Sequence, residues 1–66
     1  METFDIYFND SNDSNNKGFS LSKEEAIEKA NDMLLTRDSY VNDYIGGTIS
    51  VVCNETGKTV WEKEIK

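Results

Sequence analysis

Apolar and polar residues alternate at the start of the chain. In the segment TFDIYF, Phe4, Ile6 and Phe8 are each separated by one more polar residue. A period of two is typical of a β-strand that buries one face and exposes the other. The pattern therefore predicts a strand over residues 3–8.

A polar stretch, NDSNDSNNKG, follows over residues 9–18. Nearly every residue in it favours turns or bonds its side chain to nearby backbone. It carries no apolar periodicity of either kind. We therefore expect a flexible polar loop between the first strand and the next element.

A helical spacing of apolar residues begins after this loop and predicts a helix over residues 22–36. Ser22 followed by Glu25 is the sequence signature of a capping box. Glu25 and Lys29 stand four residues apart, which favours an ion pair along the helix. Leu35 lies off the apolar stripe, which indicates that the helix ends close to it. The stripe itself consists of Ala26, Ile27, Ala30, Met33 and Leu34.

The segment DSYVNDYI, residues 38–45, repeats a helical spacing on a shorter scale. Its apolar residues stand at positions 40, 41, 44 and 45. Such spacing fits a single helical turn with one apolar side. We expect this turn to close one end of the core.

The stretch GGTISVVCNETGKTVW and the residues after it predict a β-hairpin over residues 47–65. Residues 54–57 read as a turn that ends with Gly57 in the left-handed conformation, the pattern of a three-residue loop. That loop sets Val52 opposite Val60 on the outer face. Four side chains then point at the helix: Ile49, Val51, Cys53 and Trp61.

Together these elements predict an α+β fold in a single domain over residues 1–66. The order β-α-β-β gives a small two-layer sandwich, a three-stranded sheet with one helix packed on one face. The first strand has two places in such a sheet. Beside the last strand it makes the sheet antiparallel throughout, and beside the second it makes a right-handed parallel crossover. We favour the antiparallel sheet, since the open face is partly polar.

Charge divides the chain unevenly. It has 13 acidic and 7 basic side chains and a formal net charge of −6. Residues 1–45 hold ten of the acids and four of the bases, whereas residues 46–66 hold three of each. Anionic phosphates and membranes repel such a surface. We therefore expect neither direct nucleic-acid binding nor membrane binding, and a protein partner with a basic surface.

Catalytic side chains are scarce. The chain has no histidine and one cysteine, Cys53, which the predicted hairpin turns toward the core. A thiol without a basic or cationic neighbour is a poor nucleophile. We expect no enzymatic activity and no cofactor. A single cysteine and the lack of a long apolar run or signal peptide predict a cytoplasmic location.

One short motif is related to a calcium loop. Asp10, Asn12 and Ser14 stand at the first, third and fifth positions of an EF-hand loop. The positions that require glycine and a bidentate glutamate hold Asn15 and Leu21 instead. We therefore expect no metal site.

The outer face of the predicted helix is the first candidate for binding a partner. Glu24, Glu28 and Asp32 recur at intervals of four residues, which lines their carboxylates along one ridge. Asp38 and Asp43 extend the same acidic face. Regularly spaced carboxylates resemble the charge pattern of a phosphate backbone.

The open face of the sheet is the second candidate. Tyr7, Val52 and Val60 are expected to form a small apolar spot there, next to the free edges of the sheet. Exposed apolar patches and unpaired strand edges favour association with a second copy.

These observations favour a small acidic, non-enzymatic module that binds another protein. Its size and acidity resemble those of accessory proteins of phages and other mobile elements. One alternative is an inhibitor that imitates nucleic-acid phosphates and blocks a nucleic-acid-handling protein. A second alternative is a homodimer that associates through its sheet.

Overall fold

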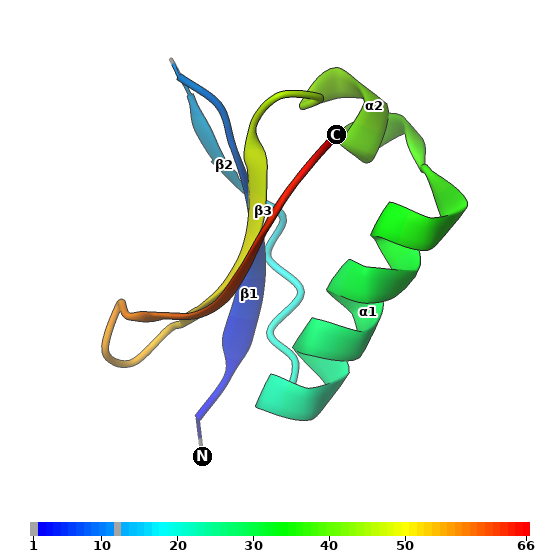
Figure 1. The fold of residues 1–66 in the computed structure, drawn as a ribbon. Helices are drawn as coiled ribbons and strands as arrows, with labels where there is room; N and C mark the ends of the chain where they lie inside the picture. Colours follow the sequence, from blue (N-terminus) through cyan, green and yellow to red (C-terminus); the bar gives the residue numbers. More distant parts are fainter. Residues whose placement is uncertain (1, 12) are drawn as a thin grey trace.

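The computed structural model describes residues 2–11 and 13–66. Within them the chain forms one sheet of four antiparallel strands and two helices, so the α+β class is confirmed (Figure 1). The prediction of three strands and one helix is wrong, because the structure adds a short strand and a short helix. The strands are β1 (Phe4–Asn9), β2 (Ser14–Asn16), β3 (Thr48–Cys53) and β4 (Thr59–Glu64), and the helices are α1 (Lys23–Thr36) and α2 (Ser39–Asp43).

The first strand lies inside the sheet. The strand order is β2-β1-β3-β4, and β1 runs antiparallel to β3 with Phe4 opposite Cys53 and Asn9 opposite Thr48. The expected antiparallel sheet is correct. The expected position of β1 beside the last strand is wrong.

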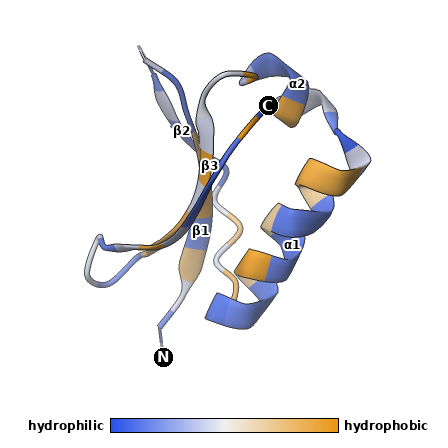
Figure 2. Cartoon of the chain, viewed as in Figure 1, coloured by the Kyte–Doolittle hydropathy of each residue, from blue (hydrophilic) through white to orange (hydrophobic). Residues whose placement is uncertain are grey.

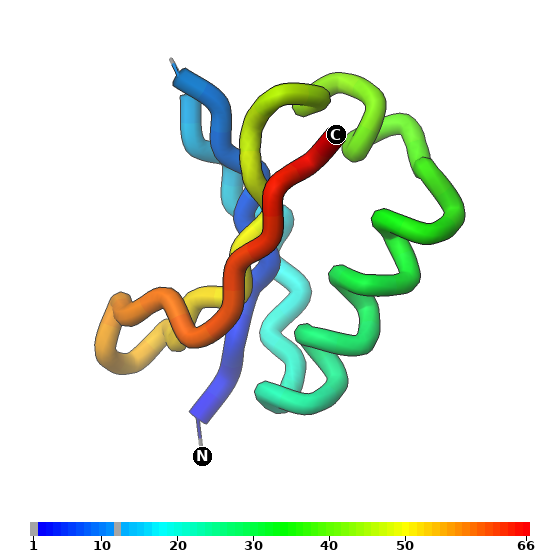
Figure 3. The backbone as a smooth tube through the Cα atoms, viewed as in Figure 1, coloured from blue at the N-terminus to red at the C-terminus, as the bar shows by residue number. Residues whose placement is uncertain are grey.

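The additional strand β2 explains this difference. It lies within residues 9–18, which the sequence predicted to be a loop, and pairs antiparallel with β1 so that Tyr7 faces Asn16. The chain therefore reverses before it enters α1, as the backbone trace shows between its blue and cyan segments (Figure 3). Because of that reversal, a strand that follows the helix enters beside β1 in the antiparallel direction.

Helix α1 begins and ends close to its predicted bounds. The hydroxyl of Ser22 accepts the backbone N–H of Glu25 at 3.3 Å, and it donates to the Glu25 carboxylate at 2.9 Å. At the other end Arg37 adopts a left-handed conformation and donates its N–H to the carbonyl of Met33 at 3.0 Å. The residues of α1 that are buried against the sheet are Ala26, Ala30 and Met33.

Helix α2 confirms the helical turn expected after α1. The carboxylate of Asp38 caps it by accepting the backbone N–H of Val41 at 3.0 Å. Val41 and Tyr44 are buried, whereas Tyr40 and Ile45 remain largely exposed. Only half of the apolar residues in this turn therefore close the core.

The core lies between α1, α2 and one face of the sheet. Hydrophobic and hydrophilic bands along α1 are distinct in Figure 2. As predicted, alternate residues of β1 point into this layer. None of the helices in the described part of the chain is long and apolar enough to cross a membrane. The buried apolar residues are Phe4, Ile6, Phe8, Ala26, Ala30, Met33, Val41, Tyr44, Ile49, Val51, Cys53 and Ile65.

The β3–β4 hairpin follows its predicted register up to Val51, which faces Trp61. Beyond that pair a β-bulge shifts the register, so that Val52 faces Thr59 and Val60 is the extra residue. The predicted Val52–Val60 pair is therefore wrong. The loop is longer by one residue than expected, since the Cys53 N–H donates to the Lys58 carbonyl at 2.9 Å. The bulge offsets the additional loop residue, so that the pairs beyond it keep the predicted register and Trp61 stays on the helix side.

Candidate functional site

The outer face of α1 carries the acidic ridge, which we define as Glu24, Glu28 and Asp32. All three are exposed, and within the described residues none of their carboxylates takes part in an ion pair or hydrogen bond. Lys29, which interrupts the ridge in the sequence, turns its ammonium to the ring of Phe19, 4.8 Å from the ring centroid. The predicted pairing of Lys29 with Glu25 is absent from the described structure. Within the described residues, no ion pair therefore joins the ridge to a basic side chain.

The two further aspartates predicted for this face lie on or beside α2. Asp38 is half-buried and caps α2 with its carboxylate. A carboxylate that accepts a backbone N–H at a helix start is held in place and partly neutralised. Asp43, at the end of α2, is exposed. Of these two, only Asp43 adds a solvated charge.

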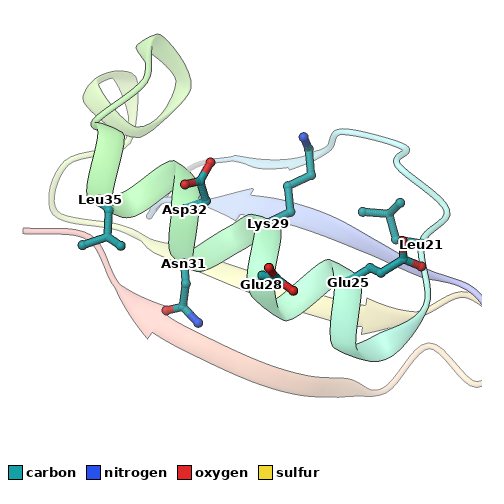
Figure 4. A pocket seen from close by; sticks show the side chains of 7 residues that line it. All are labelled: Leu21, Glu25, Glu28, Lys29, Asn31, Asp32 and Leu35. Atoms are coloured by element: carbon teal, nitrogen blue, oxygen red, sulfur yellow. The ribbon is translucent and has the colours of Figure 1, made fainter.

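Leu35 stands at the end of the same outer face. Its side chain is 83% exposed, although α1 continues through it to Thr36. A shallow hollow runs along the helix from Leu21 to Leu35 and passes Glu28 and Asp32 (Figure 4). The sequence marked Leu35 as lying off the buried stripe but gave no sign that it is presented beside the acidic ridge.

A second hollow lies between the last turns of α1 and β4. Its lining includes two leucines from α1, three basic residues and one acidic residue, Glu64. The guanidinium of Arg37 donates to the backbone carbonyl of Lys66 at 2.7 Å. Three of the seven basic residues of the chain meet here. The basic groove, as we name it, is lined by Asn31, Leu34, Leu35, Arg37, Lys63, Glu64 and Lys66.

The open face of the sheet differs from the expected apolar spot. Tyr7 and Val52 line a hollow there, but Val60 does not. The hollow is polar, because the amide of Asn9 donates to the hydroxyl of Ser50 at 3.0 Å. The side-chain oxygen of Asn9 also accepts a hydrogen bond from the hydroxyl of Ser14 at 2.7 Å. Asn9, Ser14 and Ser50 therefore bond one another on this face.

Asp5 is a buried carboxylate that alternation alone assigned to the solvent side of β1. It is 6% exposed, because the segment 17–20 covers its side chain. Backbone hydrogen bonds from Lys17 to Ile6 and from Leu21 to Phe4 hold the two ends of this segment against β1. It accepts the backbone N–H of Ser20 at 2.8 Å and the side-chain amide of Asn16 at 2.9 Å. Burial raises the pKa of Asp5, but hydrogen bonds from Asn54, Asn16 and Ser20 outweigh burial and leave the pKa below its usual value of 3.8.

The folding stability of the protein should therefore depend on pH through Asp5. A carboxyl group with a lowered pKa in the folded state stabilises the fold above its unfolded pKa. This stabilisation is lost as the pH falls through 3.8 toward the lower folded value. We expect Asp5→Asn to lower the free energy of unfolding at neutral pH by about 1 to 3 kcal/mol.

Urea denaturation between neutral and acidic pH tests this expectation. The difference between the wild type and Asp5→Asn should shrink as the pH falls below 4, and the exposed Glu24→Gln variant should track the wild type. A difference that stays constant over this range would show that the Asp5 charge contributes nothing to folding.

The aspartate and serine of the calcium-loop register and the single cysteine lie apart from the acidic ridge and the basic groove. No group of three or more His, Cys, Asp or Glu residues that could hold a metal ion occurs in residues 2–11 and 13–66. Asn12 of the calcium-loop register lies outside the described residues. Cys53 is buried on the helix side, as predicted, and its sulfur lies 3.5 Å from a carboxylate oxygen of Glu2.

Comparison of the chain with models of known protein families, with curated proteins and with solved structures gave no match. Two surfaces of opposite charge, the acidic ridge and the basic groove, flank one exposed leucine at the end of α1.

Proposed function

We propose that this protein is a small non-enzymatic module that binds other proteins through the outer face of α1. The observation that carries the proposal is the unpaired acidic ridge beside Leu35, which is 83% exposed. Like charges four residues apart on a helix destabilise it by a few tenths of a kcal/mol per pair, about 0.2 to 0.5. A partner with a basic surface removes this repulsion, and an apolar pocket in that partner accepts Leu35.

A second candidate function is inhibition of a nucleic-acid-handling protein. The ridge supports it, because carboxylates one helical turn apart and free of ion pairs in the described structure resemble a short run of phosphates. A groove built to bind nucleic acid is basic and would attract them. The identity of the captured partner distinguishes this function from general protein binding.

Capture of partners from a nuclease-treated lysate tests the proposal. Tagged wild type, Glu28→Lys and Glu55→Lys serve as baits, and bound proteins are identified by mass spectrometry after washes at about 0.1 M and about 1 M salt. Glu55 is exposed on the β3–β4 loop, far from α1, so it provides the same change of charge as a control.

We expect wild type and Glu55→Lys to retain the same stoichiometric partner at low salt. The Glu28→Lys bait should lose it, and high salt should release it, because exposed charges are screened over about 3 Å at 1 M salt. A partner that the Glu28→Lys bait retains would contradict binding through α1. If a Val60→Glu bait then loses that partner, the binding surface is the sheet.

A further inference from the structure

The acidic ridge and the basic groove are adjacent parts of one surface. Asn31 and Leu35 line both hollows. Figure 4 shows the side chains of Asn31 and Leu35 extending from α1 on the side where β4 runs. Moving along α1 from its start to its end, the surface therefore changes from acidic, through Leu35, to basic.

We propose that the partner of this surface is a second copy of the same chain, paired about a two-fold axis beside Leu35. In such a pair the acidic ridge of each copy lies against the basic groove of the other. The inference rests on the proposed function, since it names the partner of the same surface.

Charge complementarity is the reason for choosing a second copy. A two-fold interface uses the same patch on both chains, so the patch must complement itself. A patch with acids on one side of a leucine and bases on the other meets this condition, because the two-fold rotation brings opposite charges together. Glu28 of one copy then faces Lys63 of the other, and Asp32 faces Arg37.

Leu35 gives this pairing an apolar centre. At 83% exposure it is the most exposed large apolar side chain of the described residues, and Leu34 lies next to it in the groove. Interface cores are depleted in charge and apolar, with charged residues at their rim. Two copies of Leu35 in contact at the axis, with the ion pairs around them, follow this arrangement.

The free edge of β4 is a poorer place for a second copy. It carries a bulge at Val60, and Glu62, Lys63 and Glu64 follow in succession. Bulges and charged residues are the features that keep sheet edges from pairing with other chains. On the open face of the sheet, Asn9, Ser14 and Ser50 already bond one another. The helix surface is therefore the place where a second copy gains contacts.

Sedimentation equilibrium of the untagged protein tests the pairing. The variants are Leu35→Glu, Glu28→Lys, Lys63→Glu and the double variant Glu28→Lys/Lys63→Glu, with Glu55→Lys as the control. All of these positions are exposed, so each chain is expected to fold, which circular dichroism verifies. We expect wild type and Glu55→Lys to dimerise and Leu35→Glu to sediment as a monomer.

The charge variants carry the sharpest expectation. Each single substitution places like charges in contact and should weaken the dimer about tenfold or more, whereas the double variant restores opposite charges and should recover most of the affinity. Wild type that stays monomeric at about 500 μM, or a double variant no tighter than either single variant, would overturn the inference.

The capture experiment separates this outcome from a failure of the proposed function. A monomeric wild type that still retains a foreign protein through Glu28 overturns the second copy alone. A monomeric wild type that retains nothing overturns both. If untagged protein of this chain is recovered on the wild-type bait and not on a Leu35→Glu bait, both the proposed function and the second copy are supported.

Discussion

Replacing Gly47 with alanine is expected to cost about 3 kcal/mol or more of folding stability, the upper end of the range for overpacking a tight site. A Cβ atom at Gly47 would overlap the carbonyl oxygen of Asn9 and stand 3.2 Å from the Cα of Asp10. Both neighbours are backbone atoms, so no side-chain rotation relieves the overlap. The end of β1 or the start of β3 would have to move.

A chain of this size has a total stability of about 3 to 10 kcal/mol, so this loss is a large part of it. Urea denaturation followed by Trp61 fluorescence and by far-UV circular dichroism measures the change. Gly57→Ala is the control, because Gly57 has a φ of +72° and no atom within 4 Å of a new Cβ. We expect it to cost about 1 to 2 kcal/mol through backbone conformation alone. Equal losses in the two variants would show that the contact with Asn9 is unimportant.

Gly47 illustrates what a local pattern predicts and what it leaves out. The pair of glycines at 46–47 indicates a sharp turn into a strand, and Gly46 has a φ of +95°. The tight approach of Gly47 to Asn9 depends on β1 lying next to β3. Residues so far apart in the sequence give no local signal of their contact, so the constraint appears only in the folded chain.

The elements with a clear period could be predicted from the sequence. β1 alternates with a period of two, and α1 shows both a capping signature at Ser22 and a buried stripe. The predicted hairpin register is correct from Thr48–Glu64 to the Val51–Trp61 pair, although the predicted loop is one residue too short, because the bulge at Val60 offsets the longer loop. Each of these signals lies within a few residues along the chain.

The sheet topology could not be predicted because it depends on β2. This strand consists of Ser14, Asn15 and Asn16, all exposed, so it has no buried side to create a pattern. Its hydrogen bonds to β1 nevertheless reverse the chain and decide the direction in which β3 enters. The same segment, with Ser20, folds over Asp5 and turns a residue expected in solvent into a buried one.

Only the acidic half of the candidate site could be predicted from the sequence. The acidic ridge follows from a spacing of four on a helix. The basic groove combines Arg37, Lys63 and Lys66, which meet only because α1 ends beside the last part of the chain. The structure adds that Lys29 turns away to Phe19, so the ridge is less neutralised than the sequence indicates.

Phe8→Ala should lower stability by about 3 to 5 kcal/mol, the usual cost of deleting a buried aromatic ring. Phe8 is fully buried at the end of β1. Its ring centroid lies 5.5 Å from that of Tyr44 and 6.1 Å from that of Tyr40. Helix α2, with only five residues, has too few internal hydrogen bonds to persist alone. The contact with Phe8 is therefore expected to hold α2 against the sheet.

Urea denaturation measures the loss, and the near-UV circular dichroism of the tyrosines reports on α2 under native conditions. Phe8→Leu keeps most of the apolar volume, so it should lose less stability than Phe8→Ala and remain measurable if the alanine variant unfolds. The control is Ile45→Ala, where a side chain that is 56% exposed and lies outside the proposed pairing surface should change stability by less than about 0.5 kcal/mol. If Phe8→Ala is no worse than Ile45→Ala, then α2 is held by the connections at its two ends and the aromatic contacts are not needed.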